Sequence, residues 1–282
     1  MLCRIGDVEI WRILEINGPF LAPEDLFPNA GPELRAALEA SGPGQICPDS
    51  GKLILPIQGF LLKTPDRVIL VDACVGNDKT VPRLPAWHQR AGGRFMASLQ
   101  AAGVTPEQVD YVLCTHLHVD HVGWNTRLEN GRWVPTFPNA RYLLPAADDA
   151  IYRDQGADHY TESVLPVIEA GQAELVGPDH ALGDHVSLLA TPGHTPGHVS
   201  VRIRSGGAEA LITGDALHTS AQCSHPEWHF VFDLDAEQAV TSRRALLESA
   251  ADTNARVLGS HFTLPSIGRV RAKGDGFVWE GD

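Results

Sequence analysis

Short apolar runs rich in Val, Ile and Leu recur along the chain and end at Gly, Pro, Asn or Asp, which is typical of β-strands. They predict strands at residues 8–14, 57–64, 67–74, 111–116, 140–145, 186–193, 199–205, 209–216 and 255–261. Three other segments favour helices: 92–102, which precedes a Gly; 146–170, as one or two helices; and 235–250, which opens with Asp235 as an N-cap. Strands mixed with helices over the whole length predict a layered α/β architecture.

Residues 17–50 break this pattern, because they are crowded with Pro and Gly and contain one short helical piece near 32–40. Such a stretch favours a long excursion over the surface. We expect an N-terminal loop that acts as a lid or as the arm of a homodimer. A plain surface insertion is the alternative.

Composition and charge narrow the class of protein. The 282 residues are 43% hydrophobic, which is ordinary for a globular chain able to bury a sizeable core. The net charge is −13, from 35 acidic and 22 basic residues. This balance argues against binding to nucleic acid or to anionic membranes, because both would require a general basic surface on the protein.

Localisation is predicted to be cytoplasmic. The first residues have no basic segment followed by a long apolar stretch, so they do not favour a signal peptide. No apolar window approaches the ~20 residues of a membrane span. The five cysteines are scattered and include no C-x-x-C pair, which fits free thiols in a reducing compartment better than disulfides.

The stretch "THLHVDH" at residues 115–121 is the densest group of chemically active side chains. It places His116, His118, Asp120 and His121 directly after a predicted strand, with the spacing H-x-H-x-D-H. Imidazole and carboxylate are good ligands for zinc and other borderline divalent ions. The pattern therefore favours a metal site over a polar loop that is rich in histidine by chance.

Three later strands also end in potential ligands, which are His194, Asp215 and His261. Ligands at the ends of several strands converge easily at one rim of a sheet. Together with the first stretch they make five histidines and two aspartates, enough for two metal ions. His198, in the second half of "HTPGH", is interpreted as a structural histidine.

The order H-x-H-x-D-H, then G-H, G-D and S-H, resembles the metallo-β-lactamase-fold hydrolases over almost the whole chain. The resemblance implies an αββα sandwich, with two mixed β-sheets flanked by helices, in a single domain of residues 1–282. It implies two divalent ions, zinc first, with manganese, cobalt or iron as alternatives. By the resemblance, the first ion is bound by His116, His118 and His194, the second by Asp120, His121 and His261, and both by Asp215.

Two cations beside one water lower its pKa and present a bridging hydroxide, which predicts hydrolysis. Asp120 is also a candidate catalytic residue, because it could carry a proton to the leaving alkoxide, as is proposed in related lactonases. Asp72, at the end of "VILVD", matches a family position that supports the metal loop. A turn residue at the end of a strand is the alternative for Asp72.

His218 distinguishes branches of the family, because N-acyl-homoserine lactonases often have Tyr at this position. The histidine, and the run S-H-x-x-x-P-x-x-G at 260–268, look more like the methyl parathion hydrolase group. His218 is therefore a candidate catalytic residue that contacts substrate, with a packed or solvent-facing histidine as the alternative. Apolar pocket walls are expected from Phe20, Phe27, Trp87, Trp124 and the stretch 225–230, unless these pack in the core.

We therefore predict an enzyme: a metal-dependent hydrolase that opens a lactone or cleaves an ester of small-molecule size, which would make it a quorum-quenching lactonase or an esterase. The first alternative is an organophosphate triester hydrolase of the methyl parathion type. The alternative from another class is a non-catalytic, metal-stabilised binding protein.

Overall fold

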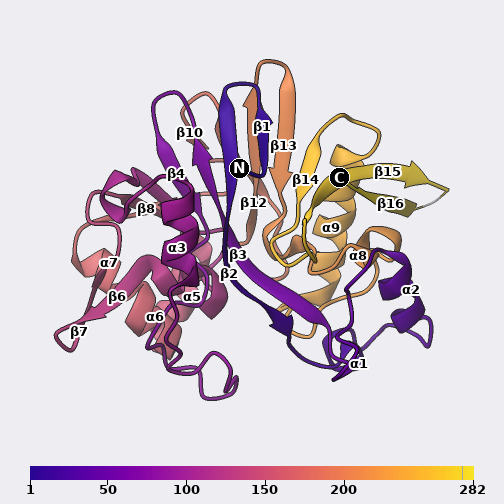
Figure 1. Ribbon diagram of the computed structural model, residues 1–282, viewed down its shortest axis with the longest axis horizontal. Coiled ribbons are helices and arrows are strands. Elements are labelled where there is room, and N and C mark those ends of the chain that lie inside the picture. The colour runs from indigo at the N-terminus through magenta and orange to yellow at the C-terminus, as the bar shows by residue number, and fades with distance from the viewer. Residues whose placement is uncertain (275) are drawn as a thin grey trace. The chain divides into compact units, whose positions relative to one another are not determined.

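The computed structural model describes residues 1–274 and 276–282, and strands are interspersed with helices along the chain (Figure 1). The chain divides into two compact units. Unit 1 comprises Met1–Glu15 and Ile57–Gly177, and unit 2 comprises Ile16–Pro56 and Pro178–Asp282. Each unit is described by itself below.

Unit 1 is built on a seven-stranded sheet with the order β1-β2-β3-β4-β5-β8-β9. Its strands are β1 (Cys3–Ile5), β2 (Val8–Pro19), β3 (Ile54–Lys63), β4 (Val68–Val71), β5 (Tyr111–Leu113), β8 (Arg141–Pro145) and β9 (Ala173–Val176). β2 and β3 continue into unit 2 at one end. The β1–β2 and β3–β4 pairs are antiparallel, whereas β4, β5, β8 and β9 run parallel. A small antiparallel sheet is formed by β6 (Thr126–Glu129) and β7 (Arg132–Pro135).

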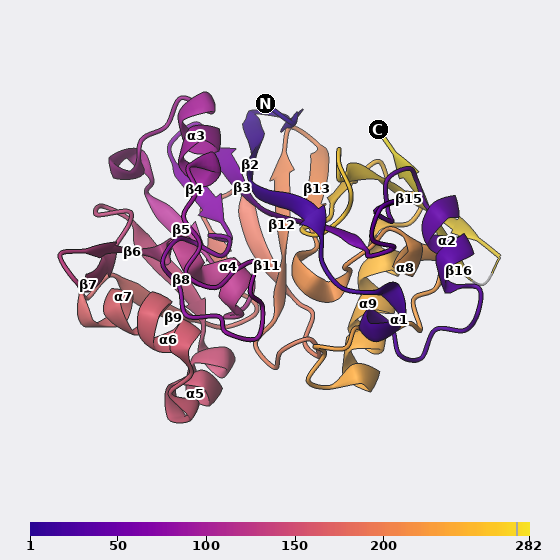
Figure 2. The same ribbon diagram turned by 60° about the horizontal axis from the view of Figure 1, so that its bottom comes forward.

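The helices of unit 1 are α3 (Arg94–Ala101), α4 (Val119–Val122), α5 (Ala146–Gln155), α6 (Asp158–Ser163) and α7 (Leu165–Glu169), with short 3-10 turns η1 (Pro106–Gln108) and η2 (Gly123–Asn125). α5 and α7 pack against β9, at the parallel side of the sheet (Figure 2). Helices on parallel strands are expected, because the connections between parallel strands must cross over the sheet.

Unit 2 contains the second seven-stranded sheet, in the order β10-β11-β12-β13-β14-β15-β16. Its strands are β10 (Ala181–Leu182), β11 (Val186–Ala190), β12 (Val199–Ser205), β13 (Ala208–Ile212), β14 (Arg256–Leu258), β15 (Ile267–Lys273) and β16 (Gly276–Gly281). All neighbours are antiparallel except β13 and β14. The helices are α1 (Pro23–Leu26), α2 (Leu34–Ala40), α8 (Ala221–Ser224) and α9 (Ala236–Ala250), with the 3-10 turn η3 (Gly214–Ala216).

The core of unit 2 forms where α9 covers this sheet. Leu246, Leu247 and Ala250 of α9 pack with Leu211 of β13 and Val257 of β14, and all five side chains are buried. β13 and β14 are thereby fixed side by side. Because they are parallel, the loops that follow them begin at the same edge of the sheet. Those loops contain Asp215 and His261.

Most predicted elements are present, with shorter strands in several places. The strand predicted at 67–74 ends at Val71, because Asp72 and Cys74 have positive φ angles, which interrupt a strand. The segment 146–170 forms three helices, not one or two, since Gly156 takes a left-handed conformation after α5 and Pro166 lies in the first turn of a new helix that begins at Leu165. α9 begins as predicted, with the Asp235 side chain accepting a hydrogen bond from the backbone N–H of Gln238.

Residues 17–50 contain α1 and α2, and α2 is the helical piece expected near 32–40. The segment is tied to the rest of unit 2 by polar contacts. The side-chain amide of Gln45 donates to Thr263 Oγ1 at 2.8 Å and lies 3.2 Å from Ser220 Oγ. The Phe20 and Phe232 rings also pack at 6.5 Å between centroids. This excursion therefore packs onto its own unit.

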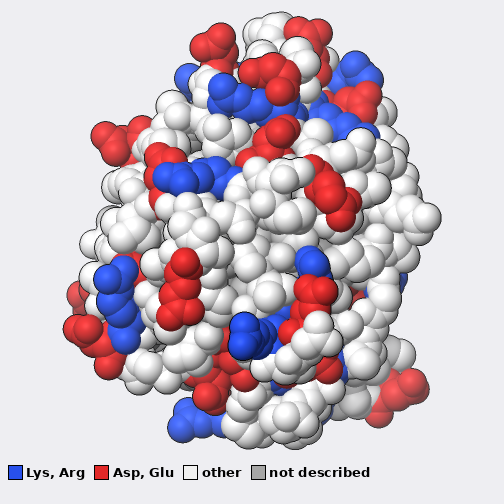
Figure 3. All heavy atoms as spheres, turned by 90° about the vertical axis from the view of Figure 1, so that its left-hand side faces the viewer, with Lys and Arg blue, Asp and Glu red and all other residues white. Residues whose placement is uncertain are grey.

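The charged side chains are mixed on the face of the molecule drawn in Figure 3, where acidic and basic residues alternate and neither sign forms a continuous patch. Among residues 1–274 and 276–282, no helix combines the length and the apolar character needed to cross a bilayer.

A close approach between two backbone segments places the loop after β5. A Cβ on Gly123 would lie 1.8 Å from the Val75 carbonyl oxygen. The Gly123 N–H donates to the Cys74 carbonyl at 2.7 Å, and the Ala73 N–H donates to the His121 carbonyl at 2.7 Å. Only glycine allows these segments to meet, so the residues after β4 and α4 form one rigid contact.

We expect Gly123→Ala to lower the free energy of unfolding by more than about 2 kcal/mol, because the added methyl group collides with backbone that cannot move aside. Gly18→Ala is the matched control, since a Cβ there meets nothing within 4 Å. Urea denaturation followed by circular dichroism measures both. Equal stabilities of the two variants would contradict this account of the loop.

Candidate metal centre

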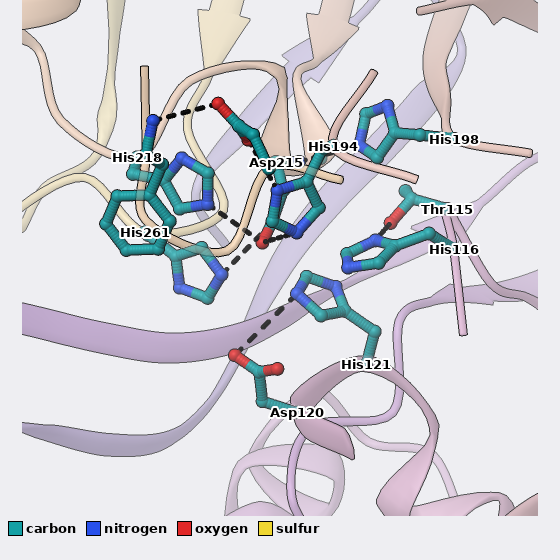
Figure 4. Close-up of polar contacts among 12 residues, drawn as sticks. Thr115, His116, Asp120, His121, His194, His198, Asp215, His218 and His261 are labelled. Atoms are coloured by element: carbon teal, nitrogen blue, oxygen red, sulfur yellow. Dashed lines mark hydrogen bonds and ion pairs between the residues drawn. The ribbon is translucent and has the colours of Figure 1, made fainter. Parts of the chain in front are cut away.

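The first group of predicted ligands, which we call cluster 1, consists of His116, His118, Asp120 and His121 in unit 1. His116 follows β5, His118 is the N-cap residue of α4, and the other two lie within α4. The His116 ring centroid lies 4.7 Å from that of His118 and 4.0 Å from that of His121. Asp120 Oδ2 lies 3.8 Å from His121 Nε2 (Figure 4). Unit 1 therefore brings all four residues together.

Asp72 holds cluster 1 from behind. Its carboxylate accepts hydrogen bonds from the Thr115 backbone N–H at 2.8 Å, from the Thr115 hydroxyl at 3.0 Å and from His121 Nδ1 at 2.9 Å. The Thr115 oxygen in turn lies 3.1 Å from His116 Nδ1. Because the Thr115 hydroxyl proton is directed to Asp72, this oxygen accepts from His116. Two rings are therefore fixed through Nδ1, and Asp72 has the supporting role expected of it.

The second group, cluster 2, lies in unit 2 around Asp215. Its Oδ2 lies 3.2 Å from His194 Nε2 and 3.1 Å from His218 Nε2, and its Oδ1 lies 3.1 Å from His261 Nε2 (Figure 4). The candidate ligand atoms of His194, Asp215 and His218 lie within 4.8 Å of one another. Unit 2 therefore brings together its three predicted ligands and the candidate catalytic His218.

The two predicted ligand histidines of cluster 2 are also held through Nδ1. His194 Nδ1 donates to Asp233 Oδ1 at 2.8 Å, and His261 Nδ1 donates to the Pro56 carbonyl at 2.8 Å. Burial on its own would lower the pKa of His194, but the carboxylates of Asp215 and Asp233 outweigh it and raise that pKa to about 9. The position of His194 thus favours positive charge on or beside this ring.

His198 differs from the predicted ligands. Its Nδ1 donates to the Thr191 carbonyl at 2.9 Å, and its Nε2 accepts from the Asp215 backbone N–H at 2.8 Å. Both ring nitrogens are therefore used inside the protein, which fits the structural role predicted for it. His198 positions the backbone of Asp215.

His218 is buried and packs face to face on Phe230, with 3.6 Å between ring centroids and 14° between planes. Burial lowers the pKa of His218 to about 4, against the opposing effect of the Asp215 carboxylate. The ring is therefore neutral at pH 7, and its Nε2–H donates to Asp215. This packing matches the alternative interpretation of His218, while its contact with substrate stays a prediction.

The aromatic residues expected to line a pocket have different surroundings. In unit 1, Trp124 is buried, donates its indole N–H to Glu15 Oε1 at 2.8 Å and stacks on Phe95, so it belongs to the core. In unit 2, Phe27 packs on Phe230 at 5.5 Å between centroids. The aromatic surroundings of cluster 2 therefore come from both the N-terminal excursion and the stretch 225–232.

The family profile of the metallo-beta-lactamase superfamily matches residues 55–261, which span both units and include every predicted ligand. The chain belongs to this superfamily. The profile confirms the resemblance drawn from the order of the motifs.

Named relatives and solved structures are also similar to the chain. An N-acyl homoserine lactonase of Bacillus cereus is 29% identical over 230 residues, covering 77% of this chain and 85% of the relative. The N-acyl homoserine lactonase AiiA of Bacillus thuringiensis subsp. kurstaki is 28% identical over 217 residues, covering 70% and 78%. The structure of AidC, a dizinc quorum-quenching lactonase in complex with a product, has a TM-score of 0.81 at 23% identity, covering 99% of this chain and 96% of that one. The hydrolase AbOPH of the beta lactamase superfamily gives the same values.

These matches confirm two predictions. The α/β fold with two mixed sheets and flanking helices is that of the superfamily, as the match to AidC over nearly the whole chain confirms. The chain is also an enzyme, a metal-dependent hydrolase, that resembles the lactonases of the superfamily.

The residues of both clusters fit a divalent metal ion in their donor chemistry. All predicted ligand atoms are imidazole nitrogens or carboxylate oxygens, which suit zinc and its neighbours. Ligand histidines almost always donate their second ring N–H to a carboxylate or carbonyl, as His121, His194 and His261 do here. Thiolate is not among the donors, and burial raises the pKa of Cys114, the cysteine next to cluster 1.

Two important contacts have no signal in the sequence. Asp233 lies in an irregular loop, and the Pro56 carbonyl that holds His261 lies at the start of β3, far away along the chain. A carboxylate in a loop and a backbone carbonyl carry no distinctive motif. Only the three-dimensional contacts identify them.

We expect Asp72→Asn to lower the free energy of unfolding by about 1–3 kcal/mol, because the amide nitrogen cannot accept and leaves a buried donor of Thr115 or His121 unpaired. Asp154→Asn, at an exposed position on α5, is the control and should change it by less than about 0.5 kcal/mol. Urea denaturation of the metal-free protein measures both. If Asp72→Asn is as stable as the control, Asp72 does not hold the loop.

Proposed function

We propose that the chain is a binuclear metal-dependent lactonase that opens the ring ester of N-acyl homoserine lactones. One observation carries the proposal: in each cluster, histidines at the predicted ligand positions are fixed through Nδ1, and in His121, His194 and His261 the other ring nitrogen, Nε2, faces the carboxylate of a predicted ligand. The lactonase relatives supply the substrate class.

The proposed ligands are those of the superfamily pattern. His116, His118 and His194 would hold the first ion, Asp120, His121 and His261 the second, and Asp215 both, with zinc as the first choice and manganese, cobalt or iron as alternatives. The superfamily profile runs through both units, which supports a single domain of residues 1–282. Segment 17–50 stays a proposed lid or dimer arm.

When bound, the two ions would supply a hydroxide at neutral pH and polarise the carbonyl oxygen of the ester. The protein's own groups act around this chemistry. His218 is neutral, and its hydrogen bond at 3.1 Å holds Asp215 Oδ2 in place. Asp120 is partly exposed, with 13% of its side chain accessible, and we assign to it the transfer of a proton to the leaving alkoxide.

Hydrolysis of organophosphate triesters is the second candidate. It is favoured by His218, which stands where lactonases often have Tyr and whose neighbour Phe230 offers an aromatic surface. A hydroxide that attacks a carbonyl carbon can also attack phosphorus, so one enzyme could perform both reactions. The substrate preference decides between them.

The direct test compares kcat/KM of the zinc-loaded protein for N-hexanoyl homoserine lactone and for an aryl dialkyl phosphate, with a chelator-treated sample as the control. We expect the lactone to be preferred by at least about 100-fold, a transition-state difference of roughly 3 kcal/mol. A preference for the phosphate would move the proposal to the organophosphate branch. Zinc-loaded protein without activity on either would contradict both.

Asp120→Asn separates the proton-transfer role from the first step. The leaving alkoxide of a lactone needs a proton, whereas a phenolate does not, so we expect lactone turnover to fall by about 10²–10⁴-fold and phosphate turnover by much less. Metal content is measured alongside by mass spectrometry, so that loss of an ion is not mistaken for loss of a proton donor. Equal losses on both substrates with metal retained would contradict the role of Asp120.

A further inference from the structure

Asp233 is a buried carboxylate beside cluster 2 that no motif in the sequence indicates. It lies in the loop between α8 and α9, and its side chain is fully shielded from solvent. One oxygen accepts the His194 Nδ1–H at 2.8 Å. A carboxylate is rarely buried away from solvent unless its charge has partners, so Asp233 is expected to have further partners.

The second oxygen of Asp233 is held in place as well. It accepts the Phe230 backbone N–H at 2.8 Å and lies 3.6 Å from the guanidinium of Arg243, which is itself fully buried in α9. Both oxygens of Asp233 are therefore fixed, one by the His194 ring and the other by the Phe230 backbone and the nearby guanidinium.

Arg243 connects this carboxylate to the rest of the site. Its Nε donates to the Ala216 carbonyl at 2.7 Å, in the 3-10 turn η3 that contains Asp215. Another guanidinium nitrogen donates to the carbonyls of Pro226 at 2.9 Å and Trp228 at 2.7 Å. One buried side chain thus fixes the loop of Asp233 and the turn of Asp215 to the same helix.

The backbone around Asp233 fixes the turn that carries His194. The Leu234 N–H donates to the His194 carbonyl at 3.1 Å, and the Asp235 N–H donates to the Gly193 carbonyl at 2.9 Å. Gly193 has φ +129°, and a Cβ there would lie 2.1 Å from the Ala239 nitrogen of α9. Both the main chain and the ring of His194 are therefore set by the segment 233–239.

From these contacts we infer that Asp233 is a positioning residue, which fixes the His194 ring with its proton on Nδ1 and its Nε2 directed at Asp215. The inference rests on the proposed function, because it assigns His194 Nε2 to a metal ion. A purely structural ion pair between Asp233 and Arg243 is the competing explanation. The two differ in what the carboxylate does for metal affinity.

The test measures zinc affinity by competition with a chromophoric chelator, on folded protein, for wild type, Asp233→Asn and Asp179→Asn. Loss of a carboxylate that orients a ligand histidine typically weakens metal binding by about 10–100-fold, so we expect this loss for one ion in Asp233→Asn. Asp179→Asn is the matched control, because Asp179 is an exposed residue in the turn before β10 of the same unit. It should leave both the melting temperature and the zinc affinity unchanged.

Asp233→Glu is the second test variant, in case Asp233→Asn does not fold. It keeps a negative charge beside Arg243 and moves the carboxylate by one methylene. Weaker zinc binding by either variant, with unchanged affinity in the control, supports the positioning role. A lower melting temperature with wild-type zinc affinity overturns it in favour of the structural ion pair. Wild type that binds no zinc overturns this inference together with the metal centre, whereas wild type that binds zinc but hydrolyses no lactone overturns only the proposed substrate.

Discussion

The structure depends on one constraint: imidazoles and carboxylates can be buried together only if each has a partner that fixes its orientation. Unpaired burial of such groups costs several kcal/mol. Here the same hydrogen bonds that satisfy the rings also choose their tautomer. His121, His194 and His261 each donate from Nδ1 to an acceptor that cannot donate back. In the neutral ring the proton is therefore on Nδ1, and Nε2 is the nitrogen with the lone pair.

The fold provides these acceptors at the ends of strands. In unit 1, β4 and β5 are parallel, so Asp72 and Thr115 emerge at one edge and meet through a carboxylate. In unit 2, β13 and β14 are parallel, and the residues that follow them include Asp215 and His261. Each unit builds its own cluster from a parallel pair, and α9 adds Arg243 and the loop of Asp233 to the second.

The sequence was informative where the chemistry is local. The spacing of His116, His118, Asp120 and His121 fixes their proximity, because a strand end followed by one helical turn leaves few alternatives. Hydrophobic runs likewise located the strands that bear the site. The sequence could not reveal contacts between distant segments, such as Asp233 with His194. It also could not reveal that His218 packs on Phe230, since residue type alone does not distinguish a buried ring from one that faces substrate.

The central claim is that the seven predicted ligands hold two metal ions. It is tested most directly by the zinc content per chain of wild type, His121→Ala, His261→Ala and the double variant, because His121 and His261 are proposed to hold the same ion. The account predicts two equivalents for wild type and one for each single variant. The double variant should also retain one. A double variant with no zinc would mean that the two histidines serve different ions, and it would contradict the account.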